Sequence, residues 1–177
     1  MKGRKKGGKS RKVMKKILID LDVVTVHLWD KSSQAEEAGR LIEKLGSKSF
    51  EVIVPYTLIE LAERWQYVAL REKVIGFYKE NAKTISVEEV REKLENFGVN
   101  DKEIIISLIA NCVKEEDAAL VIVASLFKVD YLVTFNRKHL RNREQKICDV
   151  LSDFNLPRVK IRTPQELLEE QSEEGST

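Results

Sequence analysis

The chain has 177 residues, of which 42% are hydrophobic and 34% are charged. This is the balance of a soluble globular protein of one domain, long enough to bury a core. No apolar run approaches the roughly 18 residues of a membrane span, so we expect no membrane association. The two cysteines, Cys112 and Cys148, have neither metal-type spacing nor the density of a disulfide scaffold, which predicts a cytoplasmic location.

The net charge of +2 hides an uneven distribution, because residues 1–16 carry nine of the 31 basic residues and none of the 29 acids. We interpret residues 1–15 as a disordered basic tail, residues 16–171 as the folded domain and residues 172–177 as a polar end. The tail either attracts the phosphates of RNA or DNA, or only improves solubility.

The first element expected after the tail is a strand over residues 16–22 (KILIDLD). A short apolar run of branched residues is typical of a central parallel strand that is buried on both faces. Asp20 would lie at its carboxyl end, where an acid either emerges at the sheet edge or is buried at high cost. The alternative is an ordinary turn or capping aspartate. Asp22 is a secondary candidate at the mouth of the same site, and His27 is expected to pack.

A helix, a strand and a second helix are expected next, over residues 33–46, 50–54 and 55–71. Glu60 lies off the apolar stripe of the second helix, within its second turn, so we expect it near the carboxyl end of the preceding strand. The alternative is a solvated surface charge.

The middle of the chain is informative mainly about architecture. We expect a continued helix over residues 74–81, a short extended piece over 83–86, and helices over 87–97 and 101–113. Asp101 is predicted to cap the last of these helices. These helices could form a lid or a dimer contact.

The stretch from residue 113 to residue 139 is predicted to join a buried helix to a buried strand, Tyr131–Val133. Asp117 lies at the front of this helix and could be only its N-cap. Asn136 follows the strand. A basic run beside this position is predicted to contact RNA phosphates; its members are Arg137, Lys138, Arg141 and Arg143.

A helix over residues 147–154, a strand over 159–161 and a helix over 163–170 complete the chain. The expected fold is therefore an α/β protein, a three-layer α/β/α sandwich with about four or five mostly parallel strands.

The candidate site residues Asp20, Glu60, Asp117 and Asn136 all fall at strand ends or early helix turns. In a parallel sheet these positions meet at one edge. Carboxylates brought together repel one another unless a cation lies among them. Oxygen ligands without Cys or paired His favour Mg²⁺ or Mn²⁺, which suits hydrolysis of phosphodiester bonds.

The chain resembles PIN-domain proteins, and within them the VapC-like ribonucleases, from about residue 15 to residue 170. The similar pieces occur in the right order; they are LIDLDVV, VPYTLIELAER, KEEDAALVIVAS, YLVTFNRKHL and VKIRTPQELLE. The resemblance implies a Mg²⁺- or Mn²⁺-dependent ribonuclease whose acids bind metal at the carboxyl edge of the sheet.

By this resemblance Asp20, Glu60 and Asp117 match the first three acids of the family, and Thr134 matches its hydroxyl residue. Asn136 stands where the family often has an acid, and Asp22 stands where an Asn is usual. Because Asn136 supplies no charge, we expect weak or substrate-assisted metal binding.

Three hypotheses follow. The first is a metal-dependent endoribonuclease, and the second is a catalytically weak or inactive RNA-binding module within a larger complex. The third makes the ribonuclease the toxin of a toxin–antitoxin pair, with an antitoxin protein in the crevice. The resemblance also implies a homodimer.

Overall fold

Five parallel strands form one sheet in the order β3-β2-β1-β4-β5, in a computed structural model that describes residues 14–176. This confirms the predicted α/β fold with a parallel sheet. Residues 1–13 of the predicted basic tail, and Thr177 of the polar end, lie outside the described residues. The strands are β1 (Lys15–Ile19), β2 (Phe50–Pro55), β3 (Ala82–Ile85), β4 (Tyr131–Val133) and β5 (Ile161–Arg162).

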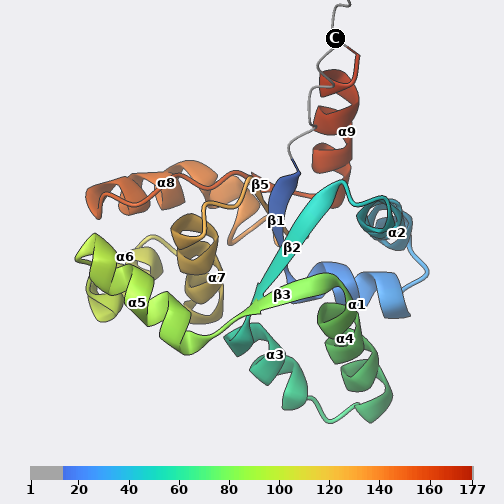
Figure 1. Ribbon diagram of the computed structural model, residues 1–177, viewed down its shortest axis with the longest axis horizontal. Coiled ribbons are helices and arrows are strands. Elements are labelled where there is room, and N and C mark those ends of the chain that lie inside the picture. The colour runs from blue at the N-terminus through green and yellow to red at the C-terminus, as the bar shows by residue number, and fades with distance from the viewer. Residues whose placement is uncertain (1–13, 177) are drawn as a thin grey trace, which may run out of the picture.

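Helices cover both faces of the sheet and so form the outer two of the three layers (Figure 1). One face carries α1 (Leu21–Trp29), α2 (Ser33–Gly46) and α4 (Val68–Asn81), with α3 (Tyr56–Glu63) next to α4. The other face carries α5 (Val87–Phe97), α6 (Asp101–Ala110), α7 (Glu115–Leu126) and α8 (Glu144–Asp153), which follows a short 3₁₀ turn (Arg141–Arg143). The last helix, α9 (Pro164–Glu174), packs against α2.

The order of the strands reverses between β1 and β4. The chain runs outward from β1 to β2 and β3, and then returns to add β4 on the other side of β1. Ile17 of β1 therefore pairs with Val52 on one side and with Tyr131 on the other. Crevices at such switch points, beyond the carboxyl ends of the strands, are where ligands bind in open α/β sheets.

The two strands at the switch point are buried on both faces, as predicted. Ile17, Leu18 and Ile19 of β1 and Leu132 and Val133 of β4 are inaccessible to solvent. Burial of this kind stabilises the fold by about 1.5–3 kcal/mol for each large aliphatic side chain. The ends of β1 and β4 are consequently held in fixed positions.

The buried phenol of Tyr78 on α4 also holds the end of β1. Its hydroxyl donates a hydrogen bond to the Ile19 carbonyl over 2.8 Å. A buried carbonyl needs such a partner, since an unpaired one costs about 1–3 kcal/mol. The residue before Asp20 is thus fixed by α4 as well as by the sheet.

The prediction of a strand over residues 16–22 is wrong in its second half. The strand ends at Ile19, and α1 begins at Leu21 with Asp20 as its N-cap. The β-branched residues of α1 favoured the prediction of a strand. In the structure, burial of Val23 and Val24 outweighs the weak helix preference of valine.

Other helices also differ from the prediction. The helix expected over residues 55–71 is divided into α3 and α4 by residues 64–67. Helix α6 is capped by Asn100, not Asp101, because the Asn100 side chain accepts hydrogen bonds from the backbone of Lys102 and Glu103. It ends at Ala110, and Cys112 just beyond it has a positive φ of 68°. Helices α2 and α5 have the predicted bounds.

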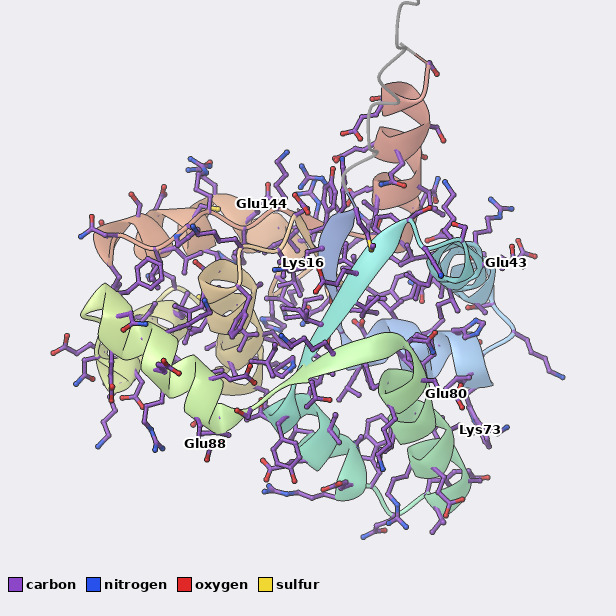
Figure 2. The ribbon with its side chains drawn as sticks, viewed as in Figure 1. Lys16, Glu43, Lys73, Glu80, Glu88 and Glu144 are labelled. Atoms are coloured by element: carbon purple, nitrogen blue, oxygen red, sulfur yellow. The ribbon has the colours of Figure 1, made fainter. Side chains whose placement is uncertain are left out.

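Charged side chains cover the outer surfaces of the helices. Figure 2 shows Glu43, Lys73, Glu80 and Glu88 at the periphery of the molecule, where all four are exposed. Within residues 14–176, no helix is both long and apolar enough to cross a membrane.

Two glycines in open surroundings should respond oppositely to alanine. Gly98 has a φ of +67° at the end of α5, whereas Gly76 lies within α4, and a Cβ would meet no atom within 4 Å at either position. Gly98→Ala should lower the free energy of unfolding by about 1 kcal/mol because a left-handed backbone strains alanine. Gly76→Ala should raise it by about 0.5–1 kcal/mol because alanine favours a helix. Urea denaturation measures the free energy of unfolding of each variant. Changes of the same sign and size in the two variants would contradict the expectation.

Candidate functional site

Asp20 lies at the switch point, between the ends of β1 and β4. Its backbone N–H donates to the Val133 carbonyl over 2.9 Å. One carboxylate oxygen accepts from the Leu21 N–H over 2.7 Å, and the other accepts from the Thr134 hydroxyl over 2.8 Å. The residue is only 8% exposed. Asp20 is therefore both the cap of α1 and a buried acid at the candidate site.

Asp22 joins Asp20 because α1 begins directly after β1. Its carboxylate accepts from the Phe135 N–H over 3.1 Å, and one of its oxygens lies 3.2 Å from the Thr134 hydroxyl oxygen. The Thr134 hydroxyl has a single proton to donate, yet it lies within hydrogen-bond distance of both carboxylates. The secondary candidates Asp22 and Thr134 thus lie beside Asp20.

Asp117 and Asn136 approach from α7 and from the end of β4. The Asn136 amide nitrogen donates to the Asp117 carboxylate over 3.2 Å, and the Asn136 amide oxygen accepts from the His139 N–H over 3.1 Å. The N-cap of α7 is Lys114, so Asp117 lies in the first turn and is not the cap. Asn136 therefore positions Asp117.

A cleft of about 700 Å³ contains these groups, a volume within the usual range of ligand sites. Its lining is partly polar and partly apolar. The polar lining residues are Asp20, Asp22, Thr25, Gln66, Lys114, Glu116, Asp117 and Asn136, and the apolar ones include Leu58, Leu61, Trp65, Leu70 and Leu120. The cleft can accept a ligand with a charged part and an apolar part.

Burial and mutual repulsion make the acids reluctant to ionise. Burial, followed by repulsion from Asp22, raises the pKa of Asp20 to about 8. Burial raises the pKa of Asp22 to about 6, and it also raises the pKa of Asp117 despite the nearby Lys114. Among the described residues, no ion pair involves any of the three acids. A bound cation would favour their charged forms.

The donor atoms fit a hard divalent cation. Carboxylate, amide and hydroxyl oxygens are ligands of Mg²⁺ and Mn²⁺. Over residues 14–176, however, no group of three or more Asp, Glu, His or Cys side chains is arranged to hold a metal ion. Mg²⁺ does not need such a cage, since it usually keeps several waters and takes one or two carboxylates together with substrate phosphates.

Glu60 is not brought together with the other predicted residues. It lines a neighbouring depression with Thr57, Arg64 and Glu115. The two hollows share only their common edge, which consists of Leu58, Leu61, Glu116 and Leu120. The predicted role of Glu60 stays a prediction.

Asp22, which the sequence offers only as a secondary candidate at the mouth of the site, shares the Thr134 hydroxyl with Asp20. An N-cap aspartate followed two residues later by an acid in the first helical turn is a common helix start. Recognising α1 would have placed Asp22 next to Asp20.

The four predicted RNA-binding residues have different surroundings. Arg137 and Lys138 are exposed beside the site. Arg141 forms an ion pair with Glu166 over 2.9 Å, and Arg137 lies 3.9 Å from the same carboxylate. Arg143 is half-buried in the 3₁₀ turn. Arg137 and Lys138 are therefore the residues best exposed for contact with a phosphate.

No family model and no curated protein sequence matches this chain. A solved structure that matches is the crystal structure of VapBC2 from Rickettsia felis bound to a DNA fragment from their promoter. The match covers 84% of this chain and 98% of the other, with a TM-score of 0.47 and 11% sequence identity. At this level of similarity it assigns no activity.

The raised pKa of Asp20 predicts a pH-dependent stability in metal-free buffer. The folded pKa of about 8 lies above the ordinary value, so the folded state holds a proton that the unfolded state has lost. The stability that this proton contributes is complete below about pH 4 and is lost as the pH rises through about 8. The free energy of unfolding should fall by several kcal/mol in all. Asparagine does not titrate, so the stability of Asp20→Asn minus that of wild type should rise from pH 5 to pH 8. Urea denaturation in EDTA measures both free energies of unfolding.

Asp153→Asn is the matched control, because Asp153 is exposed on α8. It controls for the loss of a carboxyl group. If the stability difference between Asp20→Asn and wild type did not change from pH 5 to pH 8, the Asp20 carboxyl would not be protonated in the folded protein.

Proposed function

We propose that this protein is a Mg²⁺- or Mn²⁺-dependent endoribonuclease that hydrolyses phosphodiester bonds of single-stranded RNA. The observation that supports this most is the gathering of Asp20, Asp22 and Asp117 at the switch point without an ion-pair partner among the described residues. Such an arrangement costs stability, and the cost is offset when a divalent cation binds.

A divalent cation at these acids would activate a water molecule for attack on phosphorus and stabilise charge on the phosphate oxygens. Asp20, Asp22 and Asp117 are the residues that would hold it. Thr134 orients the first two carboxylates and Asn136 orients the third. Groups that orient ligands in this way typically change metal affinity or activity by 10- to 100-fold.

The phosphate needs positive charge near the acids. Lys114 lines the cleft, and Arg137 and Lys138 are exposed beside Asn136. These side chains can contact phosphates on either side of the bond that is cut, and such contacts position a strand without reading its bases.

The resemblance to PIN-domain ribonucleases supports the same proposal. In this chain an acid, Asp22, stands where the family usually has an amide, and an amide, Asn136, stands where it often has an acid. Both lie at the switch point, one after β1 and one after β4. Asp22 thus supplies the carboxylate that Asn136 lacks, and the site has three acids.

A catalytically weak RNA-binding module is the second candidate. It is favoured by the finding that no group of three or more acidic, histidine or cysteine side chains within residues 14–176 is arranged to hold a metal. Under this alternative, RNA binding would weaken with salt and would not respond to EDTA. An antitoxin protein and a second copy of the chain are further proposed partners, both implied by the resemblance.

Loss of Asp20 or of Asp117 should strongly slow cleavage. Asp20→Asn and Asp117→Asn should each lower the rate of cleavage of a single-stranded RNA by more than about 100-fold, because direct ligands matter more than the groups that orient them. EDTA should stop the wild-type reaction and Mn²⁺ should restore it. Asp153→Asn is the control for loss of a carboxylate. Undiminished cleavage by Asp20→Asn would overturn the proposal.

Glu60→Gln distinguishes the predicted site from the one that the fold assembles. Because Glu60 lines the neighbouring depression, its loss should slow cleavage by less than about 10-fold, below the range for groups in direct contact with ligands. The measurement is the single-turnover rate in Mn²⁺. A loss as large as that of Asp20→Asn would assign Glu60 to the metal site, as the sequence predicts.

A further inference from the structure

Three aromatic side chains lie in the cleft or next to it. Trp65 and Tyr67, in the link between α3 and α4, line the cleft. Trp29, the last residue of α1, meets Tyr67 edge to face, with ring centroids 5.0 Å apart and an interplanar angle of 76°. Trp29 and Trp65 are the two tryptophans of the chain.

Trp65 is partly buried and packs against the core, whereas the other two rings are largely exposed. Trp29 is 51% exposed and Tyr67 is 58% exposed. In an edge-to-face pair the edge of one ring covers part of the face of the other, so ring surface remains free for stacking. Adjacent to a cleft, exposed aromatic surface of this kind indicates a binding site.

The backbone holds the rings in place before any ligand binds. Helices α1 and α4 lie side by side (Figure 1) and pack against each other. The Arg71 guanidinium donates to the Trp65 carbonyl over 3.3 Å, which ties the link to the first turn of α4. Little ordering entropy would therefore be lost on binding.

One face of α1 connects the aromatic rings to the acids. Asp22, Thr25 and Val26 line the cleft. Trp29 comes seven, four and three residues after them, respectively, and residues at these spacings share one face of a helix. At a rise of 1.5 Å per residue, Asp22 and Trp29 are roughly 10 Å apart along the helix axis. Trp29 and its partner Tyr67 are therefore about two helical turns from Asp22, and we call this part of the cleft, with Trp65, its aromatic end.

We propose that the aromatic end of the cleft, formed by Trp29, Trp65 and Tyr67, stacks an unpaired base of an RNA strand whose phosphate lies at the acids. This inference rests on the proposed function for the phosphate, and it adds a binding site for a flanking base. Every base has a π-face, so stacking of this kind tolerates different sequences. A base-paired duplex hides these faces, which makes single-stranded RNA the preferred substrate.

The charges of the cleft favour a nucleotide over an apolar helix of a protein partner. An apolar helix would bury Asp20, Asp22 and Asp117 against hydrocarbon, and buried charges without partners are costly. A nucleotide brings its phosphate to the acidic end, where a cation and Lys114 can pair with it. Its base then covers the apolar end.

The test compares a short single-stranded RNA with a matched strand that lacks bases at its central positions. Binding is followed by tryptophan fluorescence in Ca²⁺, which takes the same oxygen ligands. The complete strand should quench the fluorescence and bind more tightly than the abasic strand. Trp29→Ala and Tyr67→Ala should weaken binding of the complete strand by about 5- to 100-fold and leave binding of the abasic strand unchanged.

Two controls separate stacking from damage to the fold. Tyr67→Phe keeps the ring and should bind like wild type. Phe97→Ala removes a ring that is 39% exposed on α5, over the opposite face of the sheet, and should have no effect. Unchanged affinity of each variant for the abasic strand shows that the rest of the cleft is intact.

The two proposals fail separately. If the wild-type protein binds complete and abasic strands equally, the stacking site is overturned, and the aromatic end is left to an apolar partner. If the protein still cleaved RNA in Mn²⁺, the nuclease proposal would be unaffected by that result. Base-dependent binding without any cleavage in Mg²⁺ or Mn²⁺ would keep the stacking site and overturn the nuclease.

Discussion

The repulsion between Asp20 and Asp22 across the single proton of Thr134 is the constraint around which this site is built. Both carboxylates lie within 3.2 Å of one hydroxyl oxygen, and both have pKa values raised by burial and by neighbouring acids. Such an arrangement is unfavourable in an empty protein interior. A bound cation would favour the charged forms of both carboxylates, and this is the physical basis on which we propose a divalent ion at the site.

The fold tolerates this repulsion because it holds the acids from several directions. Strands β1 and β4 are buried on both faces, the Tyr78 hydroxyl binds the last carbonyl of β1, and Asp20 caps α1. The free energy of these interactions offsets the cost of the raised pKa values. A cluster of acids on a loop would separate instead. Here the switch point keeps them together.

The cleft combines this charged end with an aromatic end, and α1 joins the two. Its first turn carries Asp22 and its last residue is Trp29. One short helix therefore sets the distance between Asp22 and the proposed base-stacking rings. In such a site the phosphate is recognised by charge and the base by its flat surface, so RNA could be bound without reading its sequence.

The sequence by itself determined the class of the fold and most of the acidic site. Continuous apolar runs predicted the buried strands, and helical periodicity predicted α2 and α5. Positions after strands identified Asp20 and Asn136, and a position at the front of a helix identified Asp117. Only the tertiary structure decided the rest. It showed that residues 20–22 turn from strand to helix, which brings Asp22 to the site, and that Glu60 lies in the next depression. The physical reason is that periodicity reports which residues are buried, whereas the direction of a polar side chain at a strand end depends on how the next helix packs.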